Sequence, residues 1–331
     1  MPYEGILVIS SQLSRIAIVF YGMTYRLFPL LLLGLLTACN PPQPMADTVN
    51  AAPTPGYFKG ELTDYWYQGK AELNTYDLQQ IRYGEVHPGQ VSLIFVTEDF
   101  LTDEQVKNDN YSNPNSTPVI KTNLLRRFTT GIYDYSAMTS VFTPTDLGTQ
   151  PHTLKVTTSV QDWCGQTFTQ LNRRGGEWNM QLRSYFEKEG DVNESLGADF
   201  LEDEIFNRIR TAGSDLPTGE HRVIPSTGYL VMMHKPYQAA RANLSLGEYA
   251  GAEFSGDALR AYRIVYPKLE REVEIVFDAA APHVIRGWTE TYPSRGKTLT
   301  TVAKLTKQAI EPYWSQNSLA DGYRRAELGL E

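Results

Sequence analysis

From Tyr57 onward, short runs of aromatic and β-branched residues are separated by Gly, Pro, Asn and Asp, which is the pattern of strands and turns. The run at 272–277 nearly alternates, with Val273, Ile275 and Phe277 on one face. It predicts a hairpin with the run at 284–290, because Ala281-Pro282 turns the chain between them. Further strands, about a dozen in total, are predicted in runs that include 91–97, 154–160, 229–233, 262–266 and 299–305.

One segment has a helical pattern instead. Over 196–211, three apolar residues recur every four positions, as on one face of a helix: Leu201, Ile205 and Ile209. Ser195 is suited to cap the start of this helix, and Gly213 and Pro217 are suited to end it. The acidic side chains beside the apolar face are expected to be solvated: Glu202, Asp203 and Glu204.

These elements predict a mainly β fold, a large curved antiparallel sheet or barrel-like meander with one central helix. Strands joined by short turns pair with their sequence neighbours, and so long a meander must curl, close or fold into two layers to limit its open edges. The globular domain is expected over 57–331. Two β-layers joined by the helix at 196–211 remain an alternative arrangement.

The first part of the chain has the layout of a secretory signal. An apolar run at 27–36 follows Arg26 and is too short to cross a membrane, which needs about 20 residues. It ends in Leu36-Thr37-Ala38-Cys39, which resembles the bacterial lipobox, so that residues 1–38 are expected to be removed and Cys39 to be lipidated. Met23 is a candidate for the true start, and an uncleaved anchor helix is the alternative.

Residues 39–56 contain five prolines and no aromatic residue, which predicts a lipidated, semi-stiff tether. Without the leader the net charge falls from −8 to −9, because residues 1–38 carry one net positive charge. An acidic protein is a poor partner for nucleic acid, and its membrane contact should come from the lipid anchor. Asn40 after the lipidated Cys, in place of an Asp, favours the outer membrane.

Five segments spread over the mature chain resemble an uncharacterised lipoprotein family of the Bacteroidota: 65–73, 96–100, 159–165, 215–219 and 312–315. Members of this family often carry the label "septum formation inhibitor Maf". True Maf proteins are cytoplasmic nucleotide pyrophosphatases with an N-terminal Ser-x-Arg-Arg motif, which is not found at the start of this domain. The resemblance therefore implies an envelope lipoprotein and no known activity.

Motifs of known catalysts are missing from the sequence. Cys164 is interpreted as a small buried thiol, because no histidine pattern marks it as a nucleophile. Neither a zinc motif nor the spacing of a calcium loop is found, and no cofactor is expected. The aromatic residues are the remaining signal for a ligand, although strand packing explains most of them. Four are candidate ligand-lining residues: Tyr65, Trp66, Tyr67 and Trp163.

Two classes of function follow. The first is a non-catalytic envelope protein that binds an apolar or lipid-like ligand, or a partner protein. The second is a hydrolase with an unmarked pair of carboxylates. Perturbed carboxylates clustered in a cleft would favour the hydrolase, and a cleft lined by apolar side chains would favour the binding protein.

The lipid anchor is directly testable. In cells labelled with a radioactive fatty acid, we expect the protein to take up label, and Cys39→Ala to remain unlabelled and to run as a larger, uncleaved form. Label retained by Cys39→Ala would show that lipid is attached elsewhere.

Overall fold

The computed structural model describes residue 62, residues 64–213 and residues 215–330. The chain divides into two compact units, Met1–Val49 and Asn50–Glu331, and all described residues belong to the second. The predicted signal peptide 1–38, Cys39 and the tether 39–56 lie outside the described residues. The second unit is compact and contains all sixteen described strands, so we expect residues 50–331 to fold as one domain.

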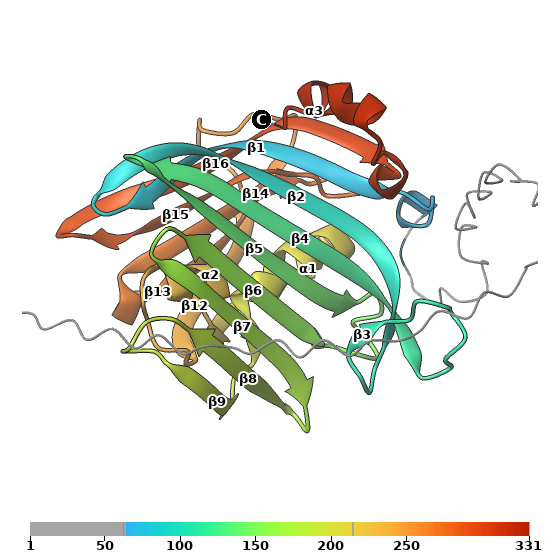
Figure 1. The fold of residues 1–331 in the computed structure, drawn as a ribbon, viewed down its shortest axis with the longest axis horizontal. Coiled ribbons are helices and arrows are strands. Elements are labelled where there is room, and N and C mark those ends of the chain that lie inside the picture. Colours follow the sequence, from blue (N-terminus) through green and yellow to red (C-terminus); the bar gives the residue numbers. More distant parts are fainter. Residues whose placement is uncertain (1–61, 63, 214, 331) are drawn as a thin grey trace, which may run out of the picture. The chain divides into compact units, whose positions relative to one another are not determined.

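Sixteen strands form one sheet in which nearly all neighbours are antiparallel (Figure 1). The strand order across the sheet is β10 to β16, then β1, β2 and β4, and then β5 to β9. The short strand β3 pairs only with β2. The strands are β1 (Ala71–Arg82), β2 (Glu85–Leu101), β3 (Val106–Lys107), β4 (Ser116–Thr130), β5 (Tyr133–Pro144), β6 (Lys155–Asp162), β7 (Gly165–Arg174), β8 (Glu177–Ser184), β9 (Asp191–Leu196), β10 (Phe200–Leu201), β11 (Gly219–Ile224), β12 (Ala240–Glu248), β13 (Leu259–Tyr266), β14 (Arg271–Asp278), β15 (Ile285–Ser294) and β16 (Lys297–Glu311).

This order places the first and last strands, β1 and β16, side by side in the middle of the sheet. The two edges, β9 and β10, follow each other directly in the sequence. The meander is therefore continuous everywhere except between β9 and β10, where the sheet stays open.

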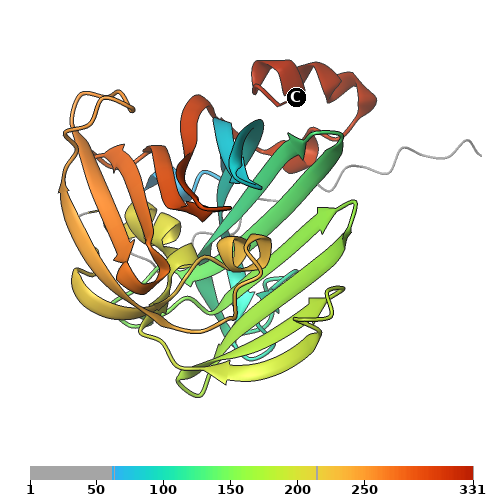
Figure 2. The ribbon, with the colours of Figure 1, turned by 90° about the vertical axis from the view of Figure 1, so that its left-hand side faces the viewer.

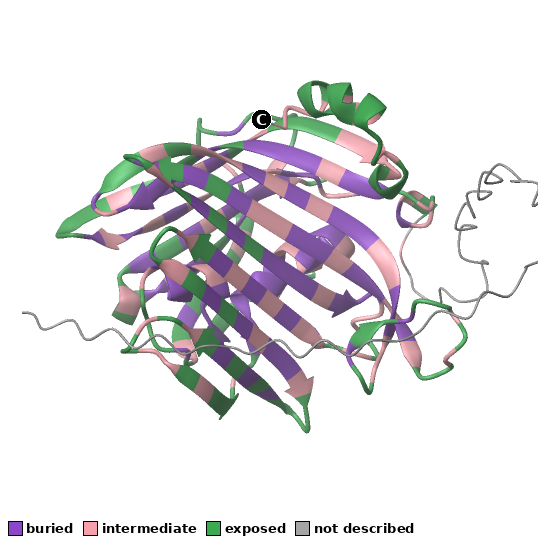
Figure 3. Ribbon diagram, in the orientation of Figure 1, coloured by how far each residue is buried: buried purple, intermediate pink, exposed green. Residues whose placement is uncertain are grey.

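The sheet curls around two helices, α1 (Ile205–Ala212) and α2 (Thr227–Met232), which lie in the space it encloses (Figure 2). Register shifts between Thr75 and Tyr76 and between Val276 and Phe277 add to the curvature, because a bulge bends its strand. Burial alternates along the strands, with one face turned to the enclosed side and the other to solvent (Figure 3).

Two buried apolar clusters fill most of the concave side. One surrounds Ile205 and Ile209 of α1 and includes strands of the β12–β16 half. The other surrounds α2 and includes strands β5 to β8. The chain ends on the outer side of the sheet, where the Thr75 hydroxyl donates to the Leu328 carbonyl (2.7 Å) and the Gln90 amide to the Gly329 carbonyl (2.7 Å). That last segment holds three short helical elements: η4 (Tyr313–Ser315), η5 (Leu319–Tyr323) and α3 (Arg324–Glu327). A fourth short turn, η1 (Asp64–Trp66), precedes β1.

The predicted mainly β fold, a large antiparallel sheet with a central helix, is confirmed. The hairpin of 272–277 with 284–290 is β14 and β15. Gly175 and Gly176 form the turn between β7 and β8, with φ of +58° and +86°, values that glycine adopts without strain. All described strands belong to one hydrogen-bonded sheet.

The central helix is shorter than predicted. It begins at Ile205, after a 3-10 turn η2 (Glu202–Glu204), and Ser195 lies in β9 instead of capping it. Phe200 and Leu201 pair with β11, which takes the chain out of helical geometry before that turn. The strand predicted at 229–233 is mostly helix α2. A short apolar run does not distinguish a buried strand from a buried helix, and this run is buried on all sides.

Candidate functional site

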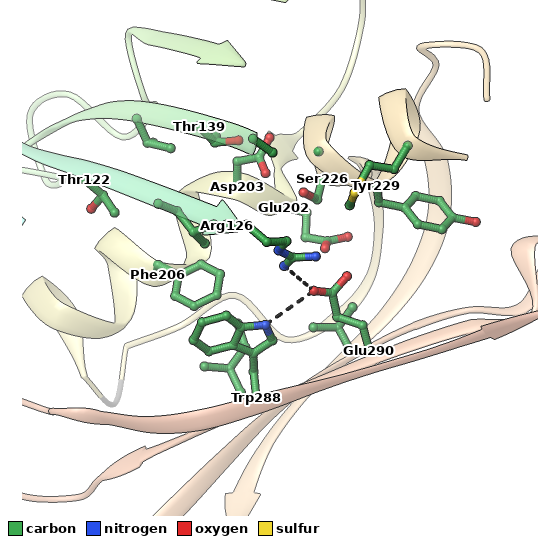
Figure 4. A pocket seen from close by; sticks show the side chains of 17 residues that line it. Thr122, Arg126, Thr139, Glu202, Asp203, Phe206, Ser226, Tyr229, Trp288 and Glu290 are labelled. Carbon is green, nitrogen blue, oxygen red and sulfur yellow. Dashed lines mark hydrogen bonds and ion pairs between the residues drawn. The ribbon is translucent and has the colours of Figure 1, made fainter. Parts of the chain in front are cut away.

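Two of the cavities among the described residues differ greatly in size. The first, here called the interior cavity, lies inside the curled sheet and has a volume of about 40 Å³. Side chains from β4 and β5 line one side, side chains from β14 and β15 line the other, and η2, α1 and α2 complete it (Figure 4). The second, here called the edge groove, has a volume of about 620 Å³ and lies by the edge strand β9.

Four charged side chains meet in and beside the interior cavity. Arg126 donates to Glu290 (Nη2 to Oε1, 2.7 Å), and Arg271 pairs with the other oxygen of Glu290 (3.3 Å). Arg271 also binds both oxygens of Glu202, at 2.5 and 2.7 Å. Burial raises the pKa of Glu290, but the positive charges of Arg126 and Arg271 outweigh it and hold that pKa below its ordinary value. Glu290 is therefore a structural carboxylate that stays ionised.

Asp203 is the carboxylate with the opposite perturbation. Burial, with a further contribution from the nearby negative charge of Glu202, raises the pKa of Asp203 to about 6. The Thr227 backbone N–H (2.9 Å) and hydroxyl (2.7 Å) both donate to the same carboxylate oxygen and limit the rise. Asp203 lines the interior cavity, and its raised pKa lies closer to neutrality than that of an ordinary aspartate.

A second buried ion pair, between Arg210 of α1 and Glu72 of β1, fixes the helix to the sheet. Tyr65 donates to the same carboxylate, and the Arg210 guanidinium lies 5.1 Å from the ring centre of Trp66 and 5.2 Å from that of Phe95. Tyr65 and Trp66, at the start of the domain, therefore pack around the Arg210–Glu72 ion pair, which lies at the end of the sheet where β1 begins.

The acidic residues at the start of the helix were expected to be solvated, and this prediction is wrong. Glu202, Asp203 and Glu204 are all buried, and the first two line the interior cavity. Each has a partner: Arg271 for Glu202, Thr227 for Asp203, and Arg208 for Glu204 (2.6 Å).

The edge groove has an apolar floor and a charged rim. The floor combines side chains of β8, β9 and α2 with one tyrosine from the following loop: Met180, Leu182, Val192, Leu230, Val231 and Tyr237. The rim carries charges of both signs from the β8–β9 turn, β9 and the loop after α2: Glu187, Lys188, Glu189, Glu194, His234 and Lys235.

Ser184, Glu189 and His234 form a hydrogen-bonded group at this rim. The Ser184 hydroxyl donates to one oxygen of Glu189 (2.6 Å), and His234 Nδ1 lies 2.6 Å from the other. In a catalytic triad the histidine stands between the serine and the acid, so that it takes the serine proton. Here the carboxylate stands in the middle, which orders the turn but does not activate the serine.

Cys164 was interpreted as a buried thiol, and this prediction is wrong, because it is exposed at the turn between β6 and β7. Its backbone N–H donates to Asp162 (2.6 Å), and the Asp162 charge raises the pKa of the thiol. A nucleophilic thiol needs the opposite shift.

None of the four candidate ligand-lining residues lines either cavity described above. Trp66 is buried, Tyr65 and Tyr67 are half-buried beside it, and Trp163 is exposed at the turn that holds Cys164. Their role in ligand binding stays a prediction.

Sequence reasoning missed the charged interior residues. The alternation of inward and outward positions along the strands would have placed two of them on the inward face. Arg271 has the same parity as Val273, Ile275 and Phe277, which form the buried face of β14. Glu290 likewise shares the inward face of β15 with Trp288.

Within the described part of the chain, no group of three or more His, Cys, Asp or Glu residues is placed to hold a metal ion. No helix among the same residues has the length and apolar character needed to cross a membrane.

No family model matches the chain, and no curated protein matches it either. Among solved structures, it is similar to a beta-barrel-like protein of domain of unknown function DUF1849 from Brucella abortus. That match has 11% identity and a TM-score of 0.44, and covers 73% of this chain and 98% of the other.

The perturbed carboxylate predicts a specific pH dependence. The pKa of Asp203 is raised to about 6 in the folded state, above the value of about 3.9 for an unfolded aspartate. Its contribution to stability is therefore complete below about pH 4 and is lost as pH rises through about 6. In urea denaturation, we expect the unfolding free energy of the parent, relative to that of Asp203→Asn, to fall by roughly 2–3 kcal/mol between pH 4 and pH 7. A difference that stays constant over this range would contradict the assignment.

Proposed function

We propose that this chain is a lipid-anchored envelope protein that binds an elongated apolar ligand in the edge groove and does not catalyse a reaction. The lipid on Cys39 would hold it to the membrane, in keeping with the acidic net charge, and no nucleic acid or cofactor takes part. A protein of the envelope is the other partner class that the sequence left open.

The contrast between the two cavities carries this proposal. The edge groove, at about 620 Å³, falls within the range of about 300–1,000 Å³ typical of small-molecule sites. The interior cavity, at about 40 Å³, has room for a few water molecules at most. Of these two cavities, the edge groove therefore has space for an organic ligand and the interior cavity has none.

The side chains that line the edge groove favour an amphiphile with an acyl chain as the ligand. Aliphatic side chains on its floor suit a hydrocarbon chain, each buried CH₂ of which contributes about 0.8 kcal/mol. The rim places Lys188, His234 and Lys235 where a polar or anionic headgroup would emerge. Charges of both signs at the rim would allow a zwitterionic headgroup as well.

The hydrolase alternative has one observation in its favour, the raised pKa of Asp203 beside Glu202 and Glu290. General acid catalysis uses such a group, but it needs a second carboxylate free to act and space for the substrate. Both neighbouring glutamates are bound to Arg271, and the cavity is too small for a sugar or an ester. The binding protein is therefore the better supported function.

The groove can be tested with a fluorescent C16 fatty acid titrated into residues 50–331. We expect saturable binding, and at least tenfold weaker binding by Val192→Glu, which places a charge in the apolar floor. Val192 is only half-buried, so the substitution should leave the fold intact.

The matched control is Asn193→Glu, which adds the same charge to the exposed face of the same strand and should bind as the parent does. Absence of saturable binding by the parent, or equal affinity in Val192→Glu, would refute the groove as the site.

A further inference from the structure

Three neighbouring hairpins carry large exposed apolar side chains at their tips. Ile132 lies at the β4–β5 turn, Trp163 at the β6–β7 turn and Tyr185 at the β8–β9 turn, and they are 82%, 69% and 74% exposed. In each turn a second aromatic or sulfur-containing residue is adjacent in sequence: Tyr133, Cys164 and Phe186. A single exposed apolar residue is ordinary, but three at adjacent hairpin tips indicate an interaction surface.

The three tips touch one another and form one surface. The ring centres of Tyr133 and Trp163 are 6.3 Å apart, which joins the first tip to the second. The Tyr185 ring covers Gly165 so closely that a Cβ there would lie 2.7 Å from it, which joins the second tip to the third. We call this surface, made by Ile132, Tyr133, Trp163 and Tyr185, the hairpin rim.

The hairpin rim lies at the same end of the sheet as the edge groove. The β8–β9 turn that carries Tyr185 continues into Phe186 and Glu189, which line the groove. The loop of His234 and Lys235 on its other side leads into β12 at this end of the sheet. Figure 2 looks towards this end, with the hairpins of the green strands on one side of α2.

The antiparallel strand pairing also shows where the hairpin rim lies relative to the start of β1. β1 ends at Arg82 beside the start of β2, and β4 ends beside that turn, since Gly89 pairs with Phe128. The rim is therefore opposite the end at which the chain enters β1. A strand of 12 residues at about 3.3 Å each makes the two ends about 40 Å apart.

The length of chain before the domain allows the rim to reach the membrane that the anchor would occupy. Residues 40–61, fully extended, span at most roughly 80 Å. This exceeds the length of β1, so a domain tethered at Cys39 can turn its far end to the same membrane. Trp and Tyr are enriched at the boundary between lipid and water, which favours a membrane as the partner of these tips.

From this geometry we propose that the hairpin rim is a membrane-contact surface, which inserts Ile132, Trp163 and Tyr185 into the lipid headgroup region and opens the edge groove towards the bilayer. The contact is apolar, because the four residues that make up the hairpin rim are all uncharged. This membrane contact rests on the proposed function and adds the place where an amphiphilic ligand would enter and leave the edge groove.

The test is co-sedimentation of residues 50–331 with phosphatidylcholine vesicles that carry brominated acyl chains. We expect binding that persists in 0.5 M salt, together with quenching of tryptophan fluorescence by the bromine atoms. The triple variant Ile132→Ser, Trp163→Ser and Tyr185→Ser should bind at least tenfold more weakly. These side chains are exposed, so their loss should leave thermal unfolding unchanged.

The chain offers a control of similar composition near the start of β1, where β16 ends. Trp314, Leu319 and Tyr323 are also exposed, but they belong to the segment that leaves β16 at the end of the sheet opposite the hairpin rim. The triple serine variant at these positions should bind vesicles as the parent does.

The proposal is overturned if the rim variant binds vesicles like the parent, if the control variant loses binding instead, or if the parent does not bind at all. Its outcome is separate from that of the proposed function. The rim variant should still bind free fluorescent fatty acid with unchanged affinity, and Val192→Glu should still bind vesicles.

Discussion

Four charged side chains in the interior of the sheet, Arg126, Glu290, Arg271 and Glu202, form one continuous series of ion pairs. β4 and β15 are four strand spacings apart along the sheet, or about 19 Å if the sheet were flat. Arg126 reaches Glu290 only because the sheet is strongly bent. Glu202 adds the start of the central helix to the same network. Removing one partner would leave a buried charge uncompensated, at a cost of about 3–5 kcal/mol, so these residues hold the curvature and the helix together.

This network decides where a ligand has room. A curled sheet with an apolar concave face could hold lipid, yet here the two helices and the ion pairs reduce the interior cavity to about 40 Å³. Space of ligand size lies instead at the open edge, where β9 has a strand neighbour on one side only and α2 provides the opposite wall. The break in the meander between β9 and β10 is thus the place where the fold leaves a site.

Strand alternation and turn residues were sufficient to predict the class of fold, as the β14–β15 hairpin shows. They were insufficient at the centre of the molecule, because polarity was taken as a sign of exposure. Glu202 is buried against Arg271, and Asp203 is buried against Thr227. Both partners are distant in sequence, so no local pattern predicts this pairing. The edge groove was also beyond prediction, since it combines β8, β9 and α2, and part of α2 was expected to be a strand.

The central claim is that an apolar ligand binds at the edge of the sheet and not inside it. Photoaffinity labelling tests this most directly: residues 50–331 are loaded with a diazirine fatty acid, irradiated, digested and mapped by mass spectrometry. The account predicts that the label falls on peptides from 180–194 and 230–237, which line the groove. Label concentrated on Leu124, Ile275 or Trp288, which line the interior cavity, would contradict it.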